Sequence, residues 1–262
     1  MKEKIHILPL NKKLVSNVIE IVRSSFKSDY LLASIYRSKG IHLFINYELE
    51  NSFSPYEYKL IKNDSGQIGC FAEFKKYSDF VFLNMIATPS DLQSKGAASQ
   101  LLINCINDYF LLGYKYLYLD VFVSNKIASD WYIKLGFKKV SKKWLLKAVN
   151  KDAEEQNTIK KCILNTHILN YPQTKVMLET YGFGMLEYVN DESNKRIGII
   201  DEDIILNNNN LIPDIECIFY IKKQLNKGNI YIISDTEHIA KTEVIDSVQR
   251  LKLDLNDFKN IH

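Results

Sequence analysis

Glycine is scarce in this sequence, with 10 residues among 262. The turn that follows the apolar run at 79–88 reads Ser-Asp-Leu-Gln-Ser-Lys-Gly-Ala-Ala-Ser, and its single glycine, Gly96, is followed by two alanines. A P-loop requires Gly-Lys-Ser/Thr at such a turn, and the dinucleotide-binding fingerprint requires three closely spaced glycines. The sequence therefore excludes both of these nucleotide-binding motifs.

Cysteine and histidine clusters are also absent. The four cysteines are widely spaced, form no Cys-x-x-Cys pair and have no group of histidines near them, whereas a disulfide scaffold or a zinc site would need such clusters. Gly-x-Ser-x-Gly and His-Glu-x-x-His do not occur either, so a hydrolase would have no catalytic residues. We expect buried free thiols in a reducing compartment, namely Cys70, Cys105, Cys162 and Cys217.

Long hydrophobic runs are missing as well. No apolar run reaches the roughly 18 residues of a membrane-spanning helix, and the run near the N-terminus stops at Pro9, short of the about 7–15 residues of a signal-peptide core. We therefore expect a cytoplasmic protein without a membrane partner. The net charge of +3 is small and no nucleic-acid-binding motif occurs, so a nucleic-acid partner is not expected. Basic residues are in excess only in the first 145 residues, which suits an anionic ligand there.

Hydrophobic periodicity predicts alternating strands and helices between residues 79 and 140. Such an order with short connections is typical of an α/β fold, in which ligands bind at strand C-terminal ends and helix N-termini. The elements expected in the first half are a helix at 11–26, a hairpin that turns at 63–66, a strand at 79–88, a helix that ends at Gly113, a strand at 114–123, a helix from Asn125 to Gly136, and a strand from 137.

A polar stretch at 147–155 indicates a domain boundary. We therefore expect a first domain at 1–148 and a second, smaller α/β domain at 149–262. The elements expected in the second domain are a hairpin that turns at 190–193, a helix and then a strand within 214–235, and a helix at 242–255.

The turn around Gly96 is suited to phosphate binding. The first N–H groups of a helix have no partner within the helix and lie at the positive end of its dipole. Gly96, Ala97 and Ala98 are small, so they would let a phosphate approach these groups, and Lys95 would add a positive charge at the rim.

Two motifs in register resemble those of the GNAT superfamily of N-acetyltransferases. Gln93-x-x-Gly96-x-Ala98 is similar to the pyrophosphate loop of that family, Arg/Gln-x-x-Gly-x-Gly/Ala. Downstream, Asn125 is followed by Ala128 at +3, by Tyr132 at +7 and by Gly-Phe at +11 and +12, as in a later motif of the family. The resemblance covers residues 79–140 well and extends over about 1–145.

The resemblance implies a GNAT-like mixed central sheet flanked by helices, which binds acetyl-CoA as cosubstrate and needs no metal. It also implies that main-chain groups at the end of the strand before the loop bind the pantetheine arm, and that the loop holds the pyrophosphate. The ligand-binding residues implied are Met85, Ile86, Ala87, Gln93, Ser94, Lys95, Gly96, Ala97, Ala98, Ser99, Asn125, Ala128 and Tyr132.

Catalytic roles follow from the same resemblance. Tyr132 is expected to be the general acid, since a phenol of pKa about 10 can protonate a departing thiolate of pKa about 8.5 at short range. Two carboxylates are candidates for the base: Asp120, on the strand before Asn125, and Glu73, on the preceding hairpin. A water chain to a backbone carbonyl is a third option, and the sequence leaves the choice open.

The expected reaction is transfer of the acetyl group of acetyl-CoA to a primary amine of a small molecule, peptide or protein by direct attack. The alternative is a GNAT-like module that binds acyl-CoA as a sensor or interaction protein without turnover. The second domain is expected to be non-catalytic. Its stretch 170–183 echoes the Asn125 motif, either as a degenerate GNAT-like unit or by chance, and a homodimer is compatible with the sequence.

Overall fold

A computed structural model of the chain describes residues 6–63, 66–93, 96–149, 167–190, 193–207 and 215–258. The chain forms two compact units. Unit 1 comprises Met1–Tyr30, His42–Ser141 and Gln249–His262, and unit 2 comprises Leu31–Ile41 and Lys142–Val248.

The two units do not follow the boundary expected at 148/149. The division lies a few residues earlier, within a strand. In addition, one segment from each half of the chain belongs to the other unit: Leu31–Ile41 is part of unit 2, and Gln249–His262 is part of unit 1. The C-terminal segment joins unit 1 through strand pairing over a long sequence distance, and Leu31–Ile41 joins unit 2 through side-chain contacts; local composition reveals neither.

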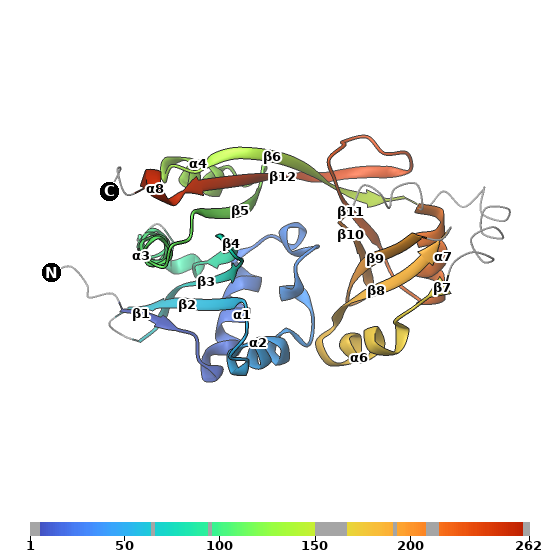
Figure 1. Ribbon diagram of the computed structural model, residues 1–262, viewed down its shortest axis with the longest axis horizontal. Helices are drawn as coiled ribbons and strands as arrows, with labels where there is room; N and C mark the ends of the chain where they lie inside the picture. The colour runs from blue at the N-terminus through green and yellow to red at the C-terminus, as the bar shows by residue number, and fades with distance from the viewer. Residues whose placement is uncertain are drawn as a thin grey trace. The chain divides into compact units, whose positions relative to one another are not determined.

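The sheet of unit 1 has the strand order β1-β2-β3-β4-β5-β12-β6 (Figure 1). The pairs from β1 to β4 are antiparallel, whereas β4 and β5 are parallel. The sheet is therefore mixed, as expected. The strand bounds are β1 His6–Pro9, β2 Tyr56–Lys62, β3 Ile68–Lys76, β4 Phe80–Ala87, β5 Tyr116–Phe122, β6 Lys138–Ala148 and β12 Thr242–Asp254.

Helices pack on this sheet. Helix α1 packs against β3 and β4, and α3 packs against β2, β3 and β4. Apolar residues of α3 recur at helical spacing and lie in the main core of the unit, together with alternate residues of the strands. The helices of this unit are η1 Lys12–Leu14, α1 Val15–Ser25, η2 Ser28–Leu31, α2 Ile41–Glu50, η4 Ser90–Leu92, α3 Ala97–Leu111, α4 Lys126–Lys134 and α8 Leu255–Phe258.

The helix expected at 242–255 is wrong, because this segment forms strand β12. The buried side chains of Leu251 and Leu253 alternate with the partly exposed Arg250 and Lys252. This period of two places the leucines in the core and the charged residues on the opposite face of the sheet. The other elements expected in the described parts of the chain are present, with ends shifted by a few residues.

Unit 2 repeats the strand pairing of unit 1. Its order is β6-β11-β10-β9-β8-β7. From β7 to β10 the pairs are antiparallel, and β10 and β11 are parallel with α7 between them in sequence, as β4 and β5 are with α3. The bounds are η3 Ile35–Arg37, β7 His167–Ile168, α6 Tyr171–Tyr181, β8 Phe183–Asn190, β9 Ser193–Ile200, β10 Asp203–Leu206, α7 Ile215–Gln224 and β11 Ile230–Ser234.

The repeated strand pairing does not account for the similarity between residues 170–183 and the motif that begins at Asn125. The stretch forms α6, which lies between β7 and β8 in the chain, whereas the motif that it echoes forms α4, after β5. The two stretches are not at equivalent places of the repeated topology. The strand pairing therefore supports a repeat of the same topology in the two units, whereas the sequence similarity at 170–183 does not.

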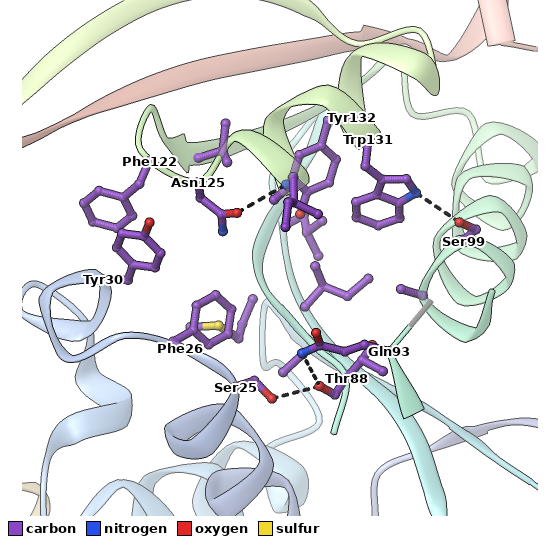
Figure 2. Close-up of a pocket in the computed structure, with 18 of the residues that line it drawn as sticks. Ser25, Phe26, Tyr30, Thr88, Gln93, Ser99, Phe122, Asn125, Trp131 and Tyr132 are labelled. Atoms are coloured by element: carbon purple, nitrogen blue, oxygen red, sulfur yellow. Dashed lines mark hydrogen bonds between the residues drawn. The ribbon is translucent and has the colours of Figure 1, made fainter. Parts of the chain in front are cut away.

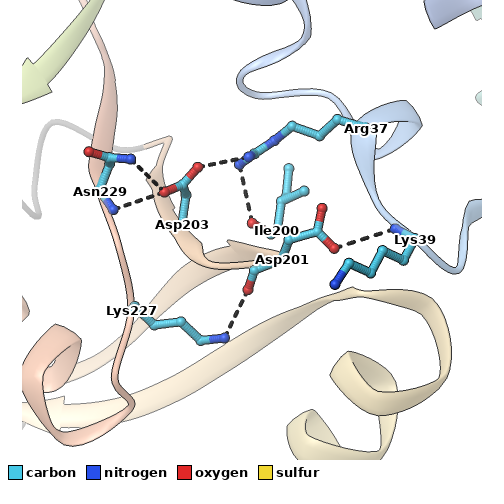
Figure 3. Close-up of polar contacts among 7 residues, drawn as sticks. All are labelled: Arg37, Lys39, Ile200, Asp201, Asp203, Lys227 and Asn229. Atoms are coloured by element: carbon cyan, nitrogen blue, oxygen red, sulfur yellow. Dashed lines mark hydrogen bonds and ion pairs between the residues drawn. The ribbon is translucent and has the colours of Figure 1, made fainter.

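The segment Leu31–Ile41 is held in unit 2 by a part-buried ion pair (Figure 3). Arg37 donates from Nη1 to Asp203 Oδ2 at 2.7 Å and from Nη2 to the Ile200 carbonyl at 3.1 Å. The other carboxylate oxygen of Asp203 accepts from the main-chain and side-chain nitrogens of Asn229, at 2.8 and 2.9 Å. Gly40 lies so close to the main chain of α6 that a Cβ would be 2.3 Å from the Thr180 carbonyl oxygen.

The cysteines differ among themselves. Cys70 and Cys105 are free and buried, as expected, whereas Cys217 is disulfide-bonded, which contradicts the expectation of a free thiol there. Cys162 lies outside the described residues. Within the described ranges, no group of three or more His, Cys, Asp or Glu residues could hold a metal ion. No helix in the same ranges has both the length and the apolar character needed to cross a membrane.

Candidate active site

A cavity of about 570 Å³ opens in unit 1 between the ends of β4 and β5 (Figure 2). Its walls come from the second half of β4, the end of β5, and the N-terminal turns of α3 and α4. The cavity therefore lies where the sequence predicted a ligand, at strand ends and helix starts of the α/β segment.

The cavity exists because β4 and β5 separate. Their parallel pairing extends from Phe80↔Tyr116 to Leu83↔Leu119 and then stops. A register shift on the other side of β4 pairs Glu73 with Met85 and the next residue of β3 with Leu83, which leaves Asn84 as an extra residue. Such a bulge bends a strand and turns it away from its neighbour. The edge of β4 that faces β5 is consequently unpaired within the described strands from Asn84 onward, and its main-chain groups are available to a ligand.

The N-terminus of α3 forms one end of the cavity. Gly96 is the N-cap residue and has φ +84°, a left-handed conformation that favours glycine. The first intrahelical bond of α3 is from Gln100 N to the Gly96 carbonyl, so the amides before Gln100 have no partner in the helix. Ala97 and Ala98 pack partly against the core as well. Their small size therefore has a packing role beside the expected one.

Asn125 caps helix α4. Its side-chain oxygen accepts from the Ala128 amide at 3.2 Å, which accounts for the spacing between these two residues by local helix geometry alone. Both residues nevertheless line the cavity. Trp131 in the same helix donates from its indole nitrogen to Ser99 Oγ at 3.0 Å, and this bond joins α4 to the first turn of α3 (Figure 2).

Tyr132 lines the cavity from α4 and is 6% exposed. Its ring packs between Trp131, at 4.6 Å between centroids, and Phe137, at 5.6 Å. Burial, with a smaller effect of the nearby Cys70 thiol, raises the pKa of the Tyr132 phenol above its ordinary value. The hydroxyl therefore stays protonated at neutral pH, as a proton donor requires.

The outer wall combines Gln93, which the sequence singled out, with residues that it did not. The Thr88 carbonyl accepts from Ser25 Oγ at 3.0 Å and from Gln93 Nε2 at 3.4 Å, so it ties α1 to the loop before α3. Tyr30 stacks on Phe122, with 4.6 Å between ring centroids. These contacts are visible in Figure 2. The Ser25–Thr88 and Tyr30–Phe122 contacts join segments far apart in the chain, which no local motif could indicate.

Glu73 lies behind the cavity wall. It is 3% exposed, and its Oε1 accepts from Asn84 Nδ2 at 2.8 Å. Asn84 is exposed and lines the cavity, whereas Glu73 does not. The sequence missed Asn84, whose position depends on the bulge in β4.

Asp120 lines the cavity and is held by an arginine. Arg250 donates from Nε to Oδ1 and from Nη2 to Oδ2 of Asp120, both at 2.8 Å. The guanidinium also lies over the ring of Phe82, 5.2 Å from its centroid. The sequence missed Arg250, because the expectation of a helix at 242–255 hid its position beside β5.

The structure brings most of the predicted site residues together around this one cavity. Glu73 does not line the cavity but bonds to Asn84, which does. Ser94 and Lys95 lie outside the described residues. The predicted residues that line the cavity are Met85, Ile86, Ala87, Gln93, Gly96, Ala97, Ala98, Ser99, Asp120, Asn125, Ala128 and Tyr132.

Residues 17–137 match the model of the Acetyltransferase (GNAT) family. A comparison with curated proteins finds no match. The matched segment holds every residue of the cavity, so the cavity lies wholly within the part of the chain that is similar to this family. The class that this family model describes is that of the acyl-CoA N-acetyltransferases.

Solved structures share the fold over nearly the whole chain. A putative acetyltransferase from Pyrococcus horikoshii has a TM-score of 0.64 at 10% identity, over 95% of this chain and 89% of that one. A GCN5-related N-acetyltransferase from Sphaerobacter thermophilus has 0.63 at 8% identity, over 96% of both chains. A tandem GNAT protein from the clavulanic acid biosynthesis pathway has 0.63 at 6% identity, over 96% of this chain and 99% of that one.

Acetyl-CoA is the cosubstrate of this class, and the residues present fit it. An elongated thioester arm can insert where β4 and β5 separate, since the main chain of β4 is unpaired there. A pyrophosphate suits the N-terminus of α3, where Gly96 takes the left-handed conformation and the next two residues carry only methyl groups.

Proposed function

We propose that unit 1 transfers the acetyl group of acetyl-CoA to a primary amine, with Tyr132 as the general acid. The observation that carries the proposal is the placement of Tyr132 beside the unpaired half of β4, in one cavity with the α3 N-terminus. An arm that enters between the strands would bring its thioester to the main-chain groups of residues 85–87. One N–H there would polarise the thioester carbonyl, as a fixed dipole does in an oxyanion hole.

The proton balance needs one donor and one acceptor. The neutral amine nitrogen attacks the carbonyl carbon, the carbon–sulfur bond breaks, and the sulfur takes the proton of the Tyr132 hydroxyl. The nitrogen then loses its extra proton to become the amide, and that proton returns through solvent to the Tyr132 phenolate. The amine must itself lose a proton, at a cost of about 4–5 kcal/mol at pH 7 for an ammonium of pKa about 10.4. A carboxylate near the attacking nitrogen would lower this cost.

Of the two candidate bases, we favour Glu73. Both oxygens of Asp120 already accept from Arg250, so an amine would have to displace a guanidinium donor to reach them. Glu73 has a hydrogen bond from Asn84, which faces the cavity. We infer that the acceptor amine approaches at Asn84 and that its proton reaches Glu73 through a water molecule.

A second candidate is an acyl-CoA-binding module without turnover. It is favoured by one observation, that each candidate base is already engaged by another side chain, Glu73 by Asn84 and Asp120 by Arg250. The same assay tests both functions, because a binding module would retain CoA but release no thiol.

The test is thiol release from acetyl-CoA across a panel of amines, comprising polyamines, aminoglycosides and peptides with free N-termini. We expect turnover by the wild-type protein and a loss on the order of 10²-fold or more in Tyr132→Phe, with a CoA dissociation constant close to the wild-type value. Tyr47→Phe is the matched control, since Tyr47 is 54% exposed on α2 and lies outside the cavity. Equal turnover in Tyr132→Phe would remove this residue from the mechanism.

A further inference from the structure

A row of aromatic and basic side chains extends from the cavity along one face of the unit 1 sheet. Successive side chains of a strand alternate between faces, so residues two apart share one. Phe82 and Phe80 therefore share one face of β4, just before the bulge at Asn84, and Tyr118 and Tyr116 share the face of Asp120 on β5. Arg250 joins the two, since it pairs with Asp120 and lies over Phe82. With Arg250 and Lys252 of β12, we call this surface the cation–aromatic face, which comprises Phe80, Phe82, Tyr116, Tyr118, Arg250 and Lys252.

The positively charged groups of this face lie over its aromatic rings. Lys252 Nζ lies 3.5 Å from the ring centroid of Tyr116 and 5.8 Å from that of Tyr118. The rings contact one another in turn, with Tyr118 at 5.3 Å from Phe80 and at 6.2 Å from Tyr116. A cation held over aromatic faces has a defined position before any ligand arrives.

The charges of the two cations differ in how they are balanced. The guanidinium of Arg250 is paired with Asp120. Among the described residues, no carboxylate lies within ion-pair distance of Lys252, whose Nζ lies over the Tyr116 ring. Farther along the same sheet, Lys75 lies in the same way over Tyr56 and Tyr77, at 5.2 and 5.5 Å from their centroids.

We propose that the cation–aromatic face binds an anionic group of the acceptor, so that the substrates are amines that also carry a carboxylate or a phosphate. This inference rests on the proposed function, in which the acceptor amine lies at Asn84. The aromatic rings would contact the chain between the two ends, and Lys252 would donate to the anion. The carboxylate of Asp120 on this face is already paired with Arg250, so the remaining positive charge disfavours polyamines at the same place.

The spacing of the strands sets the length of such a substrate. Lys252 contacts Tyr116, which is paired with Phe80, and Phe80 is four residues before Asn84 on β4. At about 3.3 Å per residue, Asn84 and Phe80 are separated by about 13 Å along the strand. The distance between the reacting amine and the anion is shorter than this, because the lysine side chain can extend toward the anion. An amine with an anionic group at the far end of an extended chain of about eight atoms matches this separation.

The experiment compares four amines that differ only in the far end: octylamine, 1,8-diaminooctane, 8-aminooctanoate and 8-aminooctyl phosphate. Thiol release from acetyl-CoA gives kcat/KM for each in the wild-type protein, Lys252→Gln and Lys252→Glu. Calorimetric titration of the same amines in the presence of CoA gives binding without turnover. Lys139→Gln is the matched control, since Lys139 is an exposed lysine of β6 in the same unit.

We expect the two anionic amines to react with at least 10-fold higher kcat/KM than octylamine, and a preference of one for the other identifies carboxylate or phosphate as the anion. In Lys252→Gln the kcat/KM for the anionic amines should fall to that for octylamine, and Lys252→Glu should favour the diamine. An equal kcat/KM for octylamine and the anionic amines, or an unchanged preference in Lys252→Gln, overturns the proposal. If no amine is acetylated, the proposed function fails, and the calorimetric titration then tests the anion site by itself. Tighter binding of the anionic amines than of octylamine, lost in Lys252→Gln, supports the site. Equal binding of the anionic amines and octylamine overturns it.

Discussion

Arg250 and Asp120 form a two-pronged ion pair at the cavity, with both nitrogen–oxygen distances at 2.8 Å across 130 positions of sequence. Asp120 was a candidate general base, and Arg250 occupies both of its oxygens. The pair also holds the end of β12 against β5, where β5 lines the cavity. We therefore assign Asp120 a positioning role and expect the proton of the amine to go elsewhere.

Substitution of the two acidic residues tests this assignment. Asp120→Asn should reduce kcat/KM less than 10-fold and leave the shape of the pH–rate profile unchanged, because a positioning residue does not take up the proton. Glu73→Gln should reduce kcat by about 10²-fold or more, as expected for loss of a general base, and should remove the dependence of the rate on pH at the acidic side. The check is a pH–rate profile of each variant.

The opposite pattern, a lost pH dependence in Asp120→Asn with an intact one in Glu73→Gln, would make Asp120 the base. Thermal unfolding of both variants serves as the control for folding. Asp120 and Arg250 are each more than a third exposed at their side chains, so the pair should contribute no more than about 1 kcal/mol to stability.

Asn125 has two possible roles that one substitution separates. Asn125→Ala should lower the free energy of unfolding by about 1 kcal/mol, because the α4 cap to the Ala128 amide is lost. Asn125→Ser should keep the cap and the unfolding midpoint. If the Asn125 amide also contacts the cosubstrate, Asn125→Ser should still weaken CoA binding several-fold in a calorimetric titration, and an unchanged affinity would limit Asn125 to capping.

Gly96→Ala should weaken CoA binding together with stability. A residue with a Cβ at φ +84° is strained by about 1–2 kcal/mol, which shifts the N-terminus of α3. Gly113→Ala is the matched control: it has φ +86° at the other end of α3 and should cost similar stability with unchanged CoA affinity. Equal CoA affinity in both variants would show that the conformation at Gly96 does not shape the binding site.

Arg37→Ala should destabilise unit 2 strongly. Asp203 is 6% exposed, and removal of its guanidinium partner leaves a buried carboxylate that has only the Asn229 amides, at a cost of about 3–5 kcal/mol. Arg196→Ala is the control in the same unit, because Arg196 is 71% exposed in its pair with Glu187 and should cost less than about 1 kcal/mol. Urea unfolding measures both, and similar midpoints would contradict the anchoring role of Arg37.

Sequence reasoning succeeded where the signal was local. The helix start at Gly96 and the capping spacing from Asn125 to Ala128 are set by a few consecutive residues, and they located the cavity. It failed where the structure depends on distant partners. Arg250 lies beside Asp120 only because β12 pairs within the unit 1 sheet, and Asn84 faces the cavity only because β4 has a bulge against β3.

The second unit shows the same limit. Its strand pairing repeats that of unit 1, yet the one sequence echo, at 170–183, lies at a different place in the topology. Apolar periodicity specifies a strand or a helix but not its neighbour in the sheet. The docking of Leu31–Ile41 in unit 2 depends likewise on Arg37 and Asp203, which are 166 positions apart.

The most direct measurement is a crystal structure of the protein with coenzyme A. We predict the pantetheine arm between residues 85–87 and Asn125, the pyrophosphate at the amides of the α3 N-terminus, and the sulfur within hydrogen-bond distance of the Tyr132 hydroxyl. Coenzyme A bound outside the cavity between β4 and β5, or a sulfur beyond the reach of Tyr132, would contradict it.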